Sequence, residues 1–246
     1  MRLRFHFRLV PFIATVLLVA LGIALGNWQE RRAAEKTALR ERMEQRGAQA
    51  PVALGPAIVP LETLEYRRVT VTGQFVPGWP VFLDNRPYQG RSGFYLLMPF
   101  KIAGSDVHVL VARGWLPADP TVHDRLPVFS TPPGQVSIEG VVSGNMGRVL
   151  QLGDAVPLKP NAIVQNVAPG QVEQASGLKL EPFFVEQTGP KEEGGALVRD
   201  WPLPSTGIEK HKGYAFQWYA LAAMALLFFV ITGFRSGTKH DDAARA

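Results

Sequence analysis

Cysteine is absent from this sequence of 246 residues. Without thiols the chain cannot form disulfide bonds, attach a c-type haem or ligate an iron–sulfur cluster through cysteine. Thiolate sites for copper or zinc are excluded for the same reason, and with them a thiol-based copper carrier.

Motifs of catalysis and nucleotide binding are missing as well. The sequence has no P-loop, no Gly-x-Gly-x-x-Gly and no Gly-x-Ser-x-Gly segment. His123 and Asp124 could act as an acid/base pair, but they lie among prolines, where a solvated loop is the competing interpretation. His108 lies in an alternating run that predicts a surface or half-buried strand position. Neither histidine has a nucleophile at a characteristic spacing. We therefore expect a protein that is not an enzyme, with a membrane-anchored hydrolase as the competing hypothesis.

Positive charge is concentrated at the two ends of the chain. The net charge is +5, from 26 basic and 21 acidic residues. Three basic residues lie in the first eight positions, and the tail from Arg235 has three basic and two acidic residues, which leaves 20 basic and 19 acidic residues between them. Because this middle part is nearly neutral, it lacks the excess of positive charge that binds polyanions, so no nucleic acid partner is expected. Basic ends are typical of two cytoplasmic tails, although other basic residues flank the far side of the first apolar run: Arg31, Arg32, Lys36, Arg40 and Arg42.

Two long runs without charge can each cross a membrane. Leu9–Gln29 and Gly213–Phe234 both meet the requirement of about 17–25 residues for a hydrocarbon core of ~30 Å. A cleaved signal peptide is the alternative for the first run, because basic residues precede it and small residues, Ala24 and Gly26, end it. The 18 residues of Leu9–Gly26 exceed the apolar region of about 7–15 residues in a signal peptide, which favours a retained anchor.

A charged helical segment and then many short strands are expected between these runs. Asn27–Arg46 lacks glycine and proline and predicts a solvated helical stalk, which the linker Gly47–Pro60 ends. One short helix is expected at Gln171–Ser176. Strand patterns lie at Tyr66–Phe75, Trp79–Asp84, Phe94–Ile102, Val107–Trp115, Val136–Val142, Ile163–Val167 and Pro182–Glu186.

These patterns predict a membrane protein in which two transmembrane α-helices flank one soluble domain. The domain is expected to be of the α+β class, mainly antiparallel β and similar to a small barrel. The expected boundaries are 1–8 and 235–246 for cytoplasmic tails, 9–29 and 213–234 for the transmembrane helices, 30–60 for the stalk and linker, and 61–212 for the β-rich domain.

The start of the second apolar run places three side chains along one helical face. His211, Tyr214 and Trp218 are spaced i, i+3 and i+7. One interpretation is an aromatic belt at the membrane interface. The other is a site for a flat apolar ligand, held between aromatic rings with an imidazole available to its metal. Trp28 and Gln29 would lie at the same depth on the first helix, which allows a site shared by both helices.

Six segments in order along the chain resemble the Surfeit-locus protein family of cytochrome c oxidase assembly factors. Each is weak alone, but together they span nearly the whole chain and are specific. One departure is Glu209-Lys210 before His211, where the family often has Asn-Asn or Asn-Arg. The six segments are LGNWQERRAAEK (25–36), YRRVTVTGQF (66–75), FLDNRPYQGRSGFYLLMPF (82–100), VLVARGWLP (109–117), EPFFVEQ (181–187) and HKGYAFQWYALA (211–222).

The resemblance implies a role in respiratory chain biogenesis. Family members of the bacterial type are implicated in binding haem a and assisting its insertion into oxidase subunit I, with the histidine of the second span as an axial ligand of the haem iron. That residue is His211 here. Tyr214, Trp218, Trp28 and Gln29 are the further candidates for the haem pocket. Such a chaperone performs no chemistry on its cargo.

Location and partners are implied in the same way. The family resemblance predicts a multi-pass protein of the bacterial inner membrane with its soluble domain in the periplasm. The implied partners are oxidase subunit I and membrane lipid, with haem a synthase as a further candidate. A haem-free membrane scaffold that stabilises an oxidase assembly intermediate remains the alternative function.

Five motif residues of the soluble domain have two interpretations. In the structural one, the glycine serves a turn and the tryptophan belongs to the core. In the functional one, these residues form a docking face for the oxidase subunit. They are Asn85, Arg86, Arg113, Gly114 and Trp115.

Overall fold

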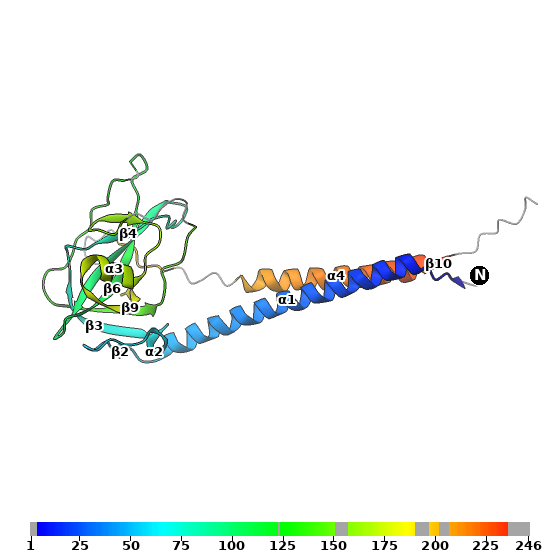
Figure 1. Ribbon diagram of the computed structural model, residues 1–246, viewed down its shortest axis with the longest axis horizontal. Helices are drawn as coiled ribbons and strands as arrows, with labels where there is room; N and C mark the ends of the chain where they lie inside the picture. The colour runs from blue at the N-terminus through cyan, green and yellow to red at the C-terminus, as the bar shows by residue number, and fades with distance from the viewer. Residues whose placement is uncertain (1–3, 123, 151–156, 190–196, 202–206, 236–246) are drawn as a thin grey trace, which may run out of the picture. The chain divides into compact units, whose positions relative to one another are not determined.

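The structure is a computed structural model that describes residues 4–122, 124–150, 157–189, 197–201 and 207–235. The chain divides into two compact units, whose elements are drawn in Figure 1. The helical unit comprises Met1–Glu41 and Pro204–Ala246, and the barrel unit comprises Arg42–Leu203. His123 and the tail beyond Arg235 lie outside the described residues.

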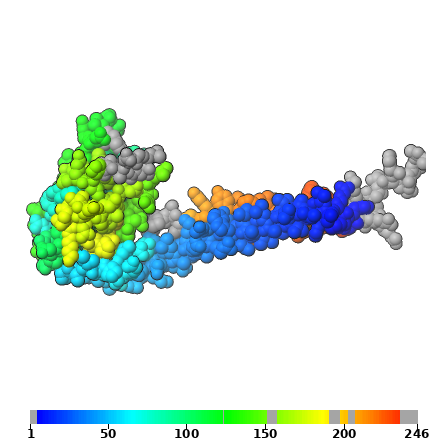
Figure 2. Space-filling model, in the orientation of Figure 1, coloured from blue at the N-terminus to red at the C-terminus, as the bar shows by residue number. Residues whose placement is uncertain are grey.

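The helical unit is built from α1 (Leu9–Ala48) and α4 (Ile208–Gly233). Both helices are long and apolar enough to cross a membrane, and the charged segment after the first apolar run continues α1 without a break. Two short strands, β1 (Arg4–Phe5) and β10 (Phe234–Arg235), pair antiparallel, so α1 begins beside the end of α4. The two helices therefore run antiparallel and lie side by side (Figures 1 and 2).

Small residues allow these two helices to approach closely. Gly22 and Gly26 are buried on α1. A Cβ atom on Gly22 would lie 2.9 Å from the Cβ of Ala222, and one on Gly26 would overlap the ring of Tyr219. Because the two glycines are four residues apart, they share one helical face. This is the Gly-x-x-x-Gly pattern of closely packed helix pairs in membranes.

In its described residues the barrel unit has eight strands, which form one mixed sheet. Their bounds are β2 Val52–Ala53, β3 Arg68–Phe75, β4 Val81–Leu83, β5 Gly93–Ile102, β6 Val107–Pro117, β7 Val136–Ser143, β8 Ala162–Val164 and β9 Lys179–Thr188. The order is β2-β3-β7-β9-β6-β5-β4-β8, and an additional pairing of β3 with β5 closes β3, β7, β9, β6 and β5 into a five-stranded barrel. Three pairs are parallel, namely β2–β3, β4–β8 and β6–β9, and the others are antiparallel.

The core of this unit has two parts, one on each face of the central strands. Along β3, Val69 and Val71 are fully buried and alternate with more exposed polar residues, which is the pattern of a strand with one buried face. Strand β6 instead buries ten consecutive residues, because β5 and β9 flank it and both of its faces are covered. One apolar cluster includes Val69 and Val71, and a second lies near β4, β8 and the helix α3 (Pro169–Ser176).

The predicted architecture of two apolar helices around a mainly antiparallel, barrel-like β domain is confirmed. Strand β9 is longer than the strand predicted at Pro182–Glu186. The proline is accommodated because it lies where the register between β6 and β9 shifts, so its missing N–H breaks no ladder bond. Helix α3 begins two residues before the predicted Gln171, since proline suits the first helical position. The short helix α2 (Leu61–Leu64) was not predicted.

Candidate functional site

An imidazole and an amide form a hydrogen-bonded pair between the two helices. His211 Nδ1 lies 2.7 Å from Gln29 Oε1, although the residues are 182 positions apart. His211 is the fourth residue of α4, which begins after Gly207 in the left-handed conformation. Both side chains are partly buried. The structure thus brings together two of the five residues that the sequence predicts for the site.

The three predicted aromatic residues differ in exposure. Trp218 is partly buried. Tyr214 is 51% exposed and Trp28 is 43% exposed, and the Trp28 ring lies against Arg32, whose guanidinium carbon is 5.9 Å from the ring centroid. Of the four buried residues of α4, three are small, as Ala215 is, and none of the three rings is fully buried. They are available to an apolar partner, which suits either an interfacial belt or a ligand.

An apolar groove of about 470 Å³ lies along the same helix pair. Among the residues that line the groove, Trp218 and Gly22 are nearest to the imidazole–amide pair. Trp218 is seven residues from His211 on α4, and Gly22 is seven residues from Gln29 on α1, which corresponds to about 10 Å along each helix. The lining is almost wholly apolar, as expected for a lipid-like or porphyrin-like ligand rather than a polar substrate. It consists of Leu18, Leu21, Gly22, Trp218, Leu221, Met224, Ala225 and Phe228.

A second hydrogen bond between the helices was not predicted. The Tyr219 hydroxyl donates to Asn27 Oδ1 at 2.8 Å. Together with the close approach of Gly26 to the Tyr219 ring, this bond is a second contact between the helices, separate from the His211–Gln29 pair. The signal that could have located this contact is the spacing of Gly22 and Gly26, because small residues four apart mark helix interfaces in membranes.

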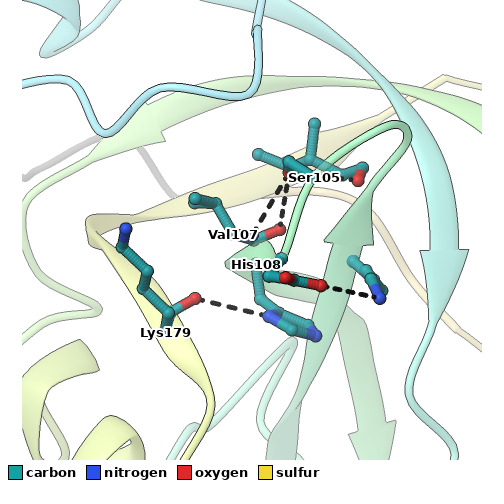
Figure 3. Close-up of polar contacts among 7 residues, drawn as sticks. Ser105, Val107, His108 and Lys179 are labelled. Carbon is teal, nitrogen blue, oxygen red and sulfur yellow. Dashed lines mark hydrogen bonds and ion pairs between the residues drawn. The ribbon is translucent and has the colours of Figure 1, made fainter.

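His108 lies in the barrel unit and has a structural environment. Contrary to the predicted surface or half-buried position, it is only 7% exposed, because β6 is covered on both faces. Figure 3 shows its Nδ1 directed at the carbonyl oxygen of Lys179, at 3.3 Å. The nearby hydroxyl of Ser105 hydrogen-bonds backbone atoms of Ile102 and Val107. Burial lowers the pKa of His108, and backbone hydrogen bonds partly oppose this. This arrangement gives the hydrolase hypothesis no support.

Arg86 ties three segments of the barrel unit together. It is 5% exposed, and its guanidinium donates to the carbonyl oxygens of Asp84, Asn85, Gly147 and Gln165 at 2.9–3.3 Å. The Arg86 carbonyl in turn accepts a hydrogen bond of 2.6 Å from the indole of Trp115. Two of the six family-like segments, 82–100 with Arg86 and 109–117 with Trp115, are therefore joined in one network of hydrogen bonds.

Arg113 and Gly114 are also internal. Arg113 is fully buried, donates to Thr131 Oγ1 at 3.2 Å, and its guanidinium carbon lies 4.5 Å from the Phe75 ring centroid. Gly114 has a φ of 150°, and a Cβ there would lie 2.9 Å from the Val198 carbonyl oxygen. These contacts favour the structural interpretation of the motif residues. Asn85 is the exposed member of the five and has a φ of 57°.

The described part of the chain contains no cluster of three or more His, Asp or Glu side chains that could ligate a metal ion. An isolated imidazole such as His211 suits a metal whose other ligands come from elsewhere, as haem iron does with its porphyrin nitrogens.

The fold and the site define a protein with a small β-barrel unit and a pair of close-packed apolar helices that carry one hydrogen-bonded imidazole. A sequence model of the SURF1 family matches residues 16–223. The chain therefore belongs to the SURF1 family.

Individual relatives agree with this assignment. A SURF1-like protein of Monosiga brevicollis is 25% identical over 238 residues, which cover 92% of this chain and 88% of the relative. A SURF1-like protein of Rickettsia felis is 26% identical over 226 residues, covering 89% of this chain and 95% of the relative. The cytochrome oxidase assembly protein SHY1 of Saccharomyces cerevisiae is 33% identical over 106 residues, which cover 42% of this chain and 27% of the yeast protein.

Proposed function

We propose that this protein is a membrane-embedded assembly factor of cytochrome c oxidase that binds haem a and assists its insertion into oxidase subunit I. The observation that carries the proposal is the imidazole of His211, hydrogen-bonded between two apolar helices that also form an apolar groove. Membership of the SURF1 family and the name of the yeast relative support the role in oxidase assembly.

The chemistry needed for this role is modest. One imidazole supplies an axial ligand for haem iron, and apolar surface shields the porphyrin from water. The rings of Trp28, Tyr214 and Trp218, none of them fully buried, offer flat apolar faces within seven residues of His211 or Gln29 along the two helices. A single imidazole orients the cargo and can be replaced by a ligand of the receiving subunit. The protein then acts as a chaperone rather than an enzyme, with subunit I as its main partner and haem a synthase as a candidate donor.

Substitution of His211, the proposed axial ligand, tests this proposal directly. We expect the full-length protein, purified from cells that make haem a, to carry a haem a absorption band. His211→Ala should weaken haem retention at least tenfold, because the axial bond is lost while the apolar surface remains. Lys212→Ala, a change of the exposed neighbour on the same turn, should leave the band unchanged. Haem-free wild-type protein that still binds subunit I would contradict the haem proposal and favour the scaffold function.

The proposed location is the bacterial inner membrane, with both tails in the cytoplasm. Residues 9–29 and 213–234 would span the bilayer, since their helices are long and apolar enough to do so. The β-rich domain would then lie in the periplasm, because an even number of spans returns the chain to its starting side. Membrane lipid would contact the exposed apolar side chains of both helices, such as Leu17 and Phe228.

Labelling of single cysteines tests this topology without background, because the chain contains no cysteine. Val128 in the barrel unit is 91% exposed. A membrane-impermeant maleimide should label Val128→Cys in intact spheroplasts. It should label Lys239→Cys, in the C-terminal tail, only after the membrane has been permeabilised. Equal labelling of both variants in intact spheroplasts would contradict the proposed orientation. A mature protein that begins after Gly26 would contradict the retained first span.

A further inference from the structure

The hydrogen bond between His211 and Gln29 determines which nitrogen of the imidazole carries the proton. Gln29 Oε1 is an amide oxygen, which accepts hydrogen bonds and cannot donate them. At 2.7 Å, Nδ1 of His211 must therefore be the donor. In the neutral ring the proton then lies on Nδ1, and Nε2 has a free lone pair.

We propose that Gln29 is a positioning residue, which holds His211 in the Nδ1–H tautomer so that Nε2 is the atom that ligates the haem iron. This inference rests on the proposed function and changes the role expected for Gln29. Its amide acts through His211 instead of contacting the cargo. Hydrogen-bonded groups on the second ring nitrogen of metal-bound histidines commonly fix both tautomer and ring orientation.

The donor and acceptor come from different helices, which makes the ligand depend on the helix pair. The bond can form when α1 and α4 are packed together, as they are where Gly22 meets Ala222. The bond from Tyr219 to Asn27 lies nearby and supports the same packing independently. Both His211 and Gln29 are partly buried, so water competes less for their polar atoms than it would on an open surface. The imidazole is therefore preorganised before any cargo arrives.

An amide acceptor also suits a ligand that must release its cargo. A carboxylate at this position would accept a charge-assisted bond and draw the Nδ1 proton more strongly, which makes Nε2 a stronger donor to iron. The neutral amide orients the ring with less effect on its ligand strength. Gln29→Glu should therefore keep the cargo bound and lower the reduction potential of the haem.

The tautomer can be measured without haem. In full-length, haem-free protein labelled with ¹⁵N-histidine and held in micelles, the signal absent from His211→Ala identifies His211. We expect a protonated Nδ1 and an unprotonated Nε2 in the wild type. Gln29→Leu, which removes the acceptor at similar size, should convert this signal to a mixture of both tautomers. Asn27→Leu is the matched control, because it removes the neighbouring bond between the helices and leaves Gln29 in place.

Haem retention gives the second measurement. Gln29→Leu should weaken haem binding about 10- to 100-fold, as is typical when the partner of a ligating histidine is lost. Asn27→Leu should change it less than threefold, and Gln29→Glu should restore binding to within threefold of the wild type. An unchanged tautomer in Gln29→Leu overturns the inference, and so does a changed tautomer with wild-type haem retention. Full haem retention in His211→Ala overturns the proposed function instead, and the haem-free tautomer measurement distinguishes the two failures.

Discussion

Arg86→Met is expected to lower the free energy of unfolding of the barrel unit by about 3–5 kcal/mol. Arg86 is 5% exposed, and its guanidinium donates to four carbonyl oxygens, which belong to the segments at 84–85, 147 and 165. Methionine fills much of the same volume but donates nothing, so all four carbonyl oxygens lose the donor that the buried Arg86 supplies. Leaving a buried acceptor without a donor costs about 1–3 kcal/mol for each group that water cannot reach.

Chemical unfolding of the full-length protein in micelles, followed by hydrogen exchange in β4 and β8, measures this loss. Arg91→Met is the matched control, because it removes the same functional group from an exposed position of the same loop. Its effect should stay within about 0.5 kcal/mol of the wild type. Arg86→Lys should fall between the two, since one ammonium keeps the charge but cannot span all four carbonyls.

The same experiment decides between the two interpretations of the motif around Arg86. If Arg86 belongs to a docking face, its substitution should weaken binding of the oxidase subunit and leave the free energy of unfolding unchanged. If Arg86 joins the loop segments, its substitution should lower the free energy of unfolding. Trp115 belongs to this network through its bond to the Arg86 carbonyl, so the structural interpretation predicts coupled effects of the two substitutions. Wild-type stability of Arg86→Met would contradict it.

Local sequence patterns predict most strands but not how the barrel closes. The alternation in Arg68–Phe75 and the turn at Gly104-Ser105 predict β3 and the β5–β6 hairpin, because both signals are short-range. The pairing of β3 with β5 and the parallel pairing of β6 with β9 join segments that are far apart in sequence. No periodicity encodes such partners. For the same reason, the run around His108 is predicted to be half-exposed, because the sequence does not show that both faces of β6 are covered.

The candidate site, too, could be predicted from the sequence only in part. Helical spacing predicts that His211, Tyr214 and Trp218 share one face of the second helix, and the ends of the two apolar runs predict that Trp28 and Gln29 lie at the same depth on the first helix. The structure joins His211 to Gln29. Which of them face the partner helix depends on the packing face, which the buried positions Gly22, Gly26 and Ala222 define. Tyr214 is therefore exposed, although it is only three residues from His211. The pattern of small residues marks that face, and hydropathy alone does not.

The barrel unit is expected to lose stability as the pH rises from about 5 to 8, the reverse of a protein stabilised by ionised carboxylates. Burial raises the pKa of Glu186 to about 7, and a hydrogen bond with Ser143 opposes this in part. Burial also raises the pKa of Glu181, whose Oε2 accepts a hydrogen bond of 3.0 Å from the Val59 N–H. Both carboxyls bind a proton more tightly in the folded chain than in the unfolded one.

The sign of the effect follows from this difference in proton binding. Below a pH of about 4.5, both states carry the Glu186 proton and its stabilising contribution is complete. Between about 4.5 and 7 the unfolded chain releases the proton first, so stability falls with rising pH and the contribution is lost above 7. A shift of this size corresponds to at most about 3 kcal/mol, reduced by the partial exposure of the side chain. His108 acts in the opposite sense, because burial lowers its pKa.

A comparison of variants separates Glu186 from His108. Glu186→Gln is neutral at every pH and keeps His108, so the difference in unfolding free energy between it and the wild type reports the carboxyl alone. We expect the unfolding free energy of the variant to rise relative to that of the wild type, by up to about 2 kcal/mol between pH 5 and 8, in denaturant titrations of the full-length protein. Glu139→Gln, at an exposed position of β7, should follow the wild-type curve. A difference that does not vary with pH would show that Glu186 is ionised in the folded barrel and that burial does not control its proton.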